Sequence, residues 1–105
     1  MRLIIDLDGT LCTEEKTFSR SLAEPLEGAV DAMRMLKERG TTLIIYSART
    51  WAEYEMTVEW LKKHGIPYDQ LVLGKPIGDF WVDDRSIRFR GWRDCLGQLK
   101  SLGRD

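Results

Sequence analysis

Two acidic residues stand where a short apolar segment meets a turn, near the beginning of the chain. Asp6 and Asp8 come directly after Leu3-Ile4-Ile5 and lead into Gly9. If the backbone stays extended, both carboxylates point the same way, and at about 4 Å they repel by roughly 4 kcal/mol at an effective dielectric near 20. Such a pair persists only when a cation or a proton offsets its charge. Hard oxygen ligands at this charge density favour Mg²⁺.

Further polar residues that could take part in a reaction follow other apolar segments. A hydroxyl, an amine and a second pair of carboxylates each stand at such a place. They are Ser47 after 42–46, Lys75 shortly after 71–73, and Asp83-Asp84 after 80–82. A lysine and a hydroxyl beside backbone N–H groups of the turn at 8–10 could hold the oxygens of a phosphoryl group. A carboxylate nucleophile can then split phosphate-ester hydrolysis into two steps, with a second carboxyl moving the protons.

The segments that must position these residues alternate between strand and helix patterns. Strands are predicted at 3–5, 42–46, 71–73 and 80–82, and helices at 28–39, 51–64 and 92–102. This alternation predicts one α/β domain over residues 1–105: a Rossmann-like, doubly wound parallel sheet in a three-layer α/β/α sandwich. Ligands of such folds bind at the carboxyl ends of the strands. All the residues singled out above fall at those ends.

In this arrangement the sequence resembles the haloacid dehalogenase superfamily. The motif D-x-D-G-T-L stands here as Asp6-Leu7-Asp8-Gly9-Thr10-Leu11. The later motifs of that superfamily are matched by Ser47, by Lys75 in Gly74-Lys75-Pro76, and by Asp83-Asp84. The four motifs occur in order, each at the end of a predicted strand. The resemblance covers residues 2 to 85.

The resemblance implies a role for each matched position. Asp6 would be the nucleophile and Asp8 the general acid and base. Phosphate would be bound by Asp8, Gly9, Ser47, Ala48 and Lys75, and Mg²⁺ by Asp6, Asp8, Asp83 and Asp84. Asp84 has the alternative of orienting Lys75. Thr10 and Arg49 are candidates for substrate contact, and an ion pair with an acidic neighbour is an equal alternative for Arg49.

The resemblance also implies a function and its alternatives. The favoured function is Mg²⁺-dependent hydrolysis of a phosphate monoester through an aspartyl-phosphate on Asp6. The intervals 11–26 and 48–74 leave no room for a cap domain, so the site is expected to be open and a homo-oligomer that shares a lid is compatible with it. A weaker resemblance to proteins of capsular polysaccharide biosynthesis suggests a sugar phosphate. The alternatives are a non-catalytic metal- and phosphate-binding partner subunit, and a phosphatase of nucleotides or polynucleotide ends.

Composition narrows the class of protein. The formal net charge is −1, from 16 basic and 17 acidic residues, which lacks the basic excess typical of duplex nucleic-acid binding. No apolar run approaches the roughly 20 residues of a membrane span or forms a secretory leader. Cys12 and Cys95 fit no metal-ligand spacing, and we expect them to be reduced thiols in a cytoplasmic protein.

Overall fold

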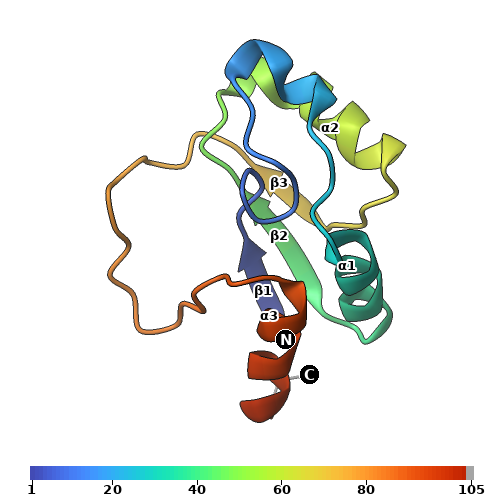
Figure 1. Ribbon diagram of the computed structural model, residues 1–105, viewed down its shortest axis with the longest axis vertical. Helices are drawn as coiled ribbons and strands as arrows, with labels where there is room; N and C mark the ends of the chain where they lie inside the picture. The colour runs from blue at the N-terminus through green and yellow to red at the C-terminus, as the bar shows by residue number, and fades with distance from the viewer. Residues whose placement is uncertain (104–105) are drawn as a thin grey trace.

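The computed structural model describes residues 1–103, which form a parallel three-stranded sheet with helices packed against it (Figure 1). The strands are β1 (Arg2–Ile5), β2 (Thr42–Tyr46) and β3 (Gln70–Val72), in the spatial order β1-β2-β3. Ile45 is the register partner of both Ile5 and Leu71. The predicted α/β class and parallel pairing are therefore confirmed for these three strands.

Three α-helices follow the strands or close the chain. They are α1 (Ala29–Glu38), α2 (Tyr54–Lys63) and α3 (Trp92–Ser101), with short 3-10 helices η1 (Thr17–Leu22) and η2 (Trp51–Glu53). In α1 the buried residues Ala29, Ala32, Met33 and Leu36 lie on one stripe, because residues three and four apart share a helix face. The helix begins after Gly28, whose φ of 79° glycine adopts without steric cost.

The two faces of the sheet are buried to different extents. Side chains alternate between faces along a strand. Ile5, Leu43, Ile45 and Leu71 point to one face and are buried in the core with the helices. On the other face Ile4 is 65% exposed, and Ile44, Tyr46 and Val72 are only partly buried. The structure thus supports a small α/β fold with one well-covered face, whereas the full three-layer sandwich stays a prediction.

The predicted fourth strand at 80–82 is wrong for this structure. Residues 76–86, here called the arm, contain no strand or helix, and they bulge away from the body on the side of β1 before the chain returns to α3 (Figure 1). Phe80 and Trp81 are 86% and 58% exposed, and Val82 is fully exposed. The apolar, β-prone composition predicted a buried strand, but a strand needs a neighbouring edge to pair with, and the arm pairs with none in this chain.

Tryptophan hydrogen bonds fix the irregular segment between β1 and α1. The Trp92 indole N–H donates to the carbonyl of Thr10 at 2.8 Å, and the Trp60 indole N–H donates to the carbonyl of Ala23 at 2.8 Å. Both indoles are almost fully buried, so each N–H needs such a partner. The bond from Trp92 anchors the turn that carries Asp8 to α3, and the bond from Trp60 anchors the later part of the segment to α2.

Asp69 joins α1 to β2 just before β3 begins. Its carboxylate accepts a hydrogen bond from the Lys37 ammonium of α1 and another, at 2.8 Å, from the backbone N–H of Leu43. The bond from Lys37, followed by that from Leu43, lowers the pKa of Asp69 below its ordinary value of 3.8. A carboxyl with a lowered folded-state pKa stabilises the fold above its ordinary pKa and loses that contribution as pH falls through the folded-state value.

We therefore predict that Asp69→Asn lowers the free energy of unfolding at pH 7 and that its difference from wild type shrinks as the pH falls below about 4. Urea unfolding at a series of pH values measures this. Asp79→Asn, an exposed position on the arm, serves as the matched control and should leave stability unchanged. An Asp69→Asn difference that is constant from pH 7 to pH 3 would show that the carboxylate charge is not what stabilises this junction.

Candidate active site

Three of the predicted site residues meet at the carboxyl edge of the sheet. Asp6 directly follows β1, Ser47 directly follows β2, and Lys75 comes three residues after β3. The backbone N–H of Ser47 donates to the carbonyl of Val72, and the backbone N–H of Lys75 donates to the carbonyl of Ser47, both at 2.9 Å. These bonds extend the pairing of β2 and β3 past the strands and so place Lys75 beside the end of β2.

Asp6 and Lys75 form the accessible centre of the site. Lys75 Nζ lies 3.7 Å from Asp6 Oδ1, and the side chain of Asp6 remains 43% exposed. Asp6 Oδ1 also accepts the backbone N–H of Leu7 at 2.9 Å. Burial raises the pKa of Asp6, while the charge of Lys75 opposes that shift. A partly exposed carboxylate beside a fixed positive charge suits a group that must meet an anionic substrate.

Asp8 is held by a buried arginine for which the sequence left substrate contact and an ion pair as equal alternatives. Arg49 Nε donates to Asp8 Oδ2 at 2.9 Å and Arg49 Nη2 donates to Asp8 Oδ1 at 2.7 Å. The Arg49 side chain is fully buried, whereas that of Asp8 is 16% exposed. Arg49 Nη1 donates to Thr57 Oγ1 of α2 at 3.0 Å. The guanidinium therefore faces Asp8 and α2 instead of solvent, and the ion-pair alternative describes its geometry.

The position of Arg49 in the sequence already indicates part of this geometry. Arg49 comes two residues after Ser47, at the end of a strand adjacent to β1. A basic side chain there lies opposite the acidic turn that follows β1. What the sequence could not give was the depth of burial, which depends on how α2 packs over the strand ends.

The other predicted phosphate-binding groups lie at this edge but are partly engaged within the protein. Ser47 is buried, and its Oγ accepts the backbone N–H of Arg49 at 3.1 Å. The Gly9 N–H donates to the Cys12 carbonyl at 2.8 Å, and the Thr10 N–H donates to the Leu7 carbonyl at 3.2 Å. Ala48 is exposed on the turn after β2. The turn at 8–10 thus uses these two N–H groups to hold its own shape.

Asp83 and Asp84 do not meet Asp6 in this chain. Both are exposed on the arm, where Asp83 Oδ1 accepts the backbone N–H of Arg85 at 2.8 Å. Within residues 1–103, no group of three or more His, Cys, Asp or Glu side chains could hold a metal ion. Arg49 already binds both carboxylate oxygens of Asp8, so Asp6 is the one accessible carboxylate among the predicted ligands at this edge of the sheet. Within one chain Asp83 and Asp84 add no carboxylate beside it, whereas Mg²⁺ takes one or two carboxylates together with waters and substrate phosphate.

Aromatic side chains surround Lys75. Lys75 Nζ lies 5.6 Å from the centre of the Tyr46 ring and 5.1 Å from that of Trp81. Trp51 packs against Gly74, where an added Cβ would lie 3.1 Å from the indole nitrogen, and it stacks on Tyr54 with ring centres 5.9 Å apart. Trp51 and Tyr54 are 58% and 41% exposed. Lys75 is thus next to an exposed aromatic pair.

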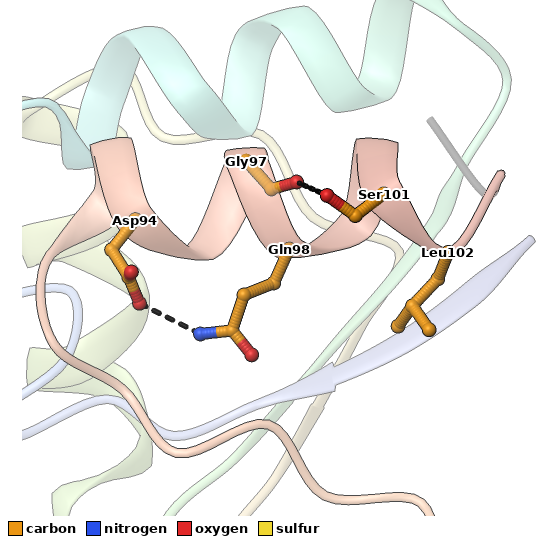
Figure 2. Close-up of a pocket in the computed structure, with 5 residues that line it drawn as sticks. All are labelled: Asp94, Gly97, Gln98, Ser101 and Leu102. Atoms are coloured by element: carbon orange, nitrogen blue, oxygen red, sulfur yellow. Dashed lines mark hydrogen bonds between the residues drawn. The ribbon is translucent and has the colours of Figure 1, made fainter.

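A shallow hollow elsewhere on the molecule carries none of the site residues. Figure 2 shows it along α3, where Gln98 donates to Asp94 at 2.7 Å and Ser101 donates to the Gly97 carbonyl at 3.1 Å. Its lining has a single acidic residue and no basic one. The carboxyl edge of the sheet is the better candidate site.

Comparison with solved structures places this arrangement among known proteins. A crystallised protein from Vibrio cholerae is 28% identical, with a TM-score of 0.76 over 97% of this chain and 98% of its own. The Pnkp1/Rnl/Hen1 complex contains a chain that is 27% identical, with a TM-score of 0.62 over 79% of this chain. A structure of the Pnkp1/Rnl/Hen1 RNA repair complex matches the fold at 23% identity and a TM-score of 0.61 over 96% of this chain. This chain spans 31% of the length of each of the last two.

Two further comparisons concern sequence and membrane topology. No protein with a curated description matches the sequence significantly. Among residues 1–103 no helix has the length and apolarity to cross a bilayer. The sequence does match the family described as PITM 1-3, LNS2 domain, over residues 3–84. This stretch includes β2, β3 and all of β1 but its first residue, together with Asp6, Ser47, Lys75 and Asp83-Asp84. Because this match covers most of the chain, the protein belongs to that LNS2 domain family, which is a family of the phosphatase type.

Proposed function

We propose that this protein is a phosphomonoesterase of the haloacid dehalogenase type, with Asp6 as its nucleophile. The observation that carries the proposal is the accessible Asp6 carboxylate 3.7 Å from Lys75 Nζ at the carboxyl edge of a parallel sheet. Lys75 would attract the dianionic phosphate and offset the charge that develops on its oxygens. An Asp6 oxygen would attack phosphorus, the bond to the leaving oxygen would break, and water would then hydrolyse the aspartyl-phosphate.

Asp8 is the group placed to move protons. Two hydrogen bonds from Arg49 fix the plane of its oxygens. In the first step the protonated Asp8 carboxyl would give its proton to the leaving oxygen. The carboxylate formed in this way would accept a proton from the attacking water in the second step, which restores the acid. Arg49 therefore acts on the reaction through Asp8 and is a positioning residue.

Cysteine chemistry is the competing covalent mechanism and is disfavoured. Cys12 lies close to the site, with Sγ 3.7 Å from Asp8 Oδ1, but it is fully buried. Burial and the negative charge of Asp8 raise the pKa of Cys12 to about 12. Because the thiolate is the nucleophile, a thiol with this pKa is inert at neutral pH.

The substrate class is a finer part of the same proposal. The exposed Trp51–Tyr54 pair beside Gly74 offers a flat apolar surface next to the phosphate-binding lysine, which suits a substrate with a planar base. The name of one similar complex refers to RNA repair, which agrees with a phosphorylated polynucleotide end. Sugar phosphates of polysaccharide synthesis form the second class, and they would make no use of the aromatic pair.

We predict that Asp6→Asn lowers phosphate release by at least about 10³-fold, because the neutral amide cannot attack phosphorus. The assay is phosphate release from nucleotides, phosphorylated oligonucleotide ends and sugar phosphates, each with added Mg²⁺ and with a chelator. Asp31→Asn, an exposed position in the first turn of α1, is the matched control and should retain full activity. Equal turnover by Asp6→Asn and wild type would exclude Asp6 as the nucleophile. Release restricted to sugar phosphates would remove the polynucleotide-end assignment.

The role of Arg49 gives a second prediction. Arg49→Lys keeps the positive charge but cannot donate in parallel to both Asp8 oxygens, so we expect kcat to fall about 10–100-fold with little change in KM. The conservative variant is preferred because complete loss of one partner of a buried ion pair costs about 3–5 kcal/mol of stability.

The control for this prediction is Arg34→Lys, at a position on α1 whose guanidinium donates to the Gly65 carbonyl. Both variants should retain the far-UV circular dichroism of the wild type. A rise in KM with unchanged kcat in Arg49→Lys would show that Arg49 contacts substrate, which is the other alternative that the sequence left open.

A further inference from the structure

The candidate site lacks the carboxylates that its own chain carries on the arm. Asp83 and Asp84 match the acidic motif that follows a fourth strand, and the family match extends through residue 84. In this structure they are exposed, and no metal-holding group of side chains forms in the described part of the chain. The carboxylates that the site lacks are therefore the same residues that lie exposed on the arm.

The place where a fourth strand would lie is open. Among residues 1–103, β1 pairs with β2 alone, so its outer edge presents unpaired backbone groups. A strand added there in parallel would end beside Asp6, because parallel strands bring their carboxyl ends to the same edge. Exposed edges of this kind are templates for pairing with another chain.

The arm has the composition of the missing strand and no cover of its own. Phe80, Trp81 and Val82 are predominantly exposed, and Ile77 is 86% exposed. Contiguous exposed apolar side chains of this kind mark surfaces that bind another protein chain. Both ends of the arm are fixed to the body. The Gly74 N–H donates to the Arg49 carbonyl at 2.9 Å, and Phe89 packs edge-on against Trp92 with ring centres 5.3 Å apart.

The chain is too short to place its own arm in that slot. The backbone N–H of Lys75 donates to the carbonyl of Ser47, and the register of β1 and β2 sets Ser47 level with Leu7. For Asp83 to stand level with Asp6, Phe80 must stand level with Leu3, about 13 Å down the sheet and at least about 10 Å across it. The straight line from Lys75 to this position of Phe80 is about 16 Å long and passes through β1. The five residues 76–80, fully extended, reach at most about 18 Å. A path that goes around the face of the sheet is longer than this reach.

We propose that the arm of a second copy of this chain occupies the open edge of β1 and brings its Asp83 and Asp84 to Asp6. Two copies exchange arms reciprocally, as the symmetry of a homodimer requires, so each site is built from both chains. The second copy approaches from outside the sheet, where the reach of the connecting residues sets no limit. This inference rests on the proposed function, because the exchanged carboxylates complete that same site.

Complementation between inactive variants tests the exchange. Asp6→Asn and the double variant Asp83→Asn, Asp84→Asn are each expected to be inactive. After co-refolding of equal amounts, half of the dimers are mixed and each mixed dimer holds one intact site, so about a quarter of wild-type activity should return. The absence of any recovery, with mixed dimers shown by two affinity tags, would overturn the proposal.

A covalent readout separates failure of the exchange from failure of the proposed function. In a Cys95→Ser background, Ile4→Cys combined with Trp81→Cys, the position that this register sets level with Ile4, should form a disulfide-linked dimer on mild oxidation, while either single variant alone should not form the same mixed linkage. An intrachain disulfide in a monomer would show that the arm closes on its own chain and would overturn the exchange. The linked dimer supports the exchange even where no phosphate ester is hydrolysed.

The oligomeric state provides the remaining check. Light scattering should give a dimer for the wild type and a monomer for Val82→Lys, because a lysine at this position would have to be buried at the edge of β1. Leu22→Lys, at a position 75% exposed on η1, is the matched control and should remain dimeric. A wild type that is monomeric at all concentrations, or a dimer insensitive to Val82→Lys, would overturn the proposal.

Discussion

Burial of the Arg49 guanidinium is the constraint on which the arrangement of the site depends. An arginine cannot discard its charge, so a buried one must be paired and hydrogen-bonded. Asp8 supplies both carboxylate oxygens and Thr57 supplies a hydroxyl, which ties the turn after β1 to the end of β2 and to α2. Loss of Asp8 would leave an unpaired charge in the core, and loss of the Thr57 hydroxyl would remove the oxygen acceptor of Arg49 Nη1. The position of Asp8 is therefore specified by the fold and needs no ligand.

Burial of Arg49 gives the two carboxylates of the first motif different surroundings. Arg49 donates to both oxygens of Asp8, whereas Asp6 stays accessible and interacts with Lys75 at a longer distance. Two like charges so close in sequence would repel in the absence of cations. Here each has its own basic partner, which offsets part of that repulsion. The same pairing assigns different roles to the two acids, because one is accessible to a substrate and the other is oriented.

The structure also links the incomplete sheet with the incomplete site. One face of the sheet is only partly covered, β1 has an open edge, and the apolar arm that follows Lys75 is exposed. These features are unfavourable for an isolated chain, since apolar surface and unpaired backbone both favour association. Because these features lie together beside Asp6, the pairing of an arm with the edge of β1 would relieve them together.

The sequence alone determined the strands at 3–5, 42–46 and 71–73, the helices and the meeting of Asp6, Ser47 and Lys75. Those features depend on local apolar periodicity and on the geometry of parallel strands, and both can be inferred from the order of residues. Burial of Arg49 and the course of the arm were decided only in three dimensions. The arginine is buried because α2 covers the strand ends, and residues 80–82 form no strand because their chain offers them no edge within reach. Local composition predicts a strand, but pairing is a property of the whole fold.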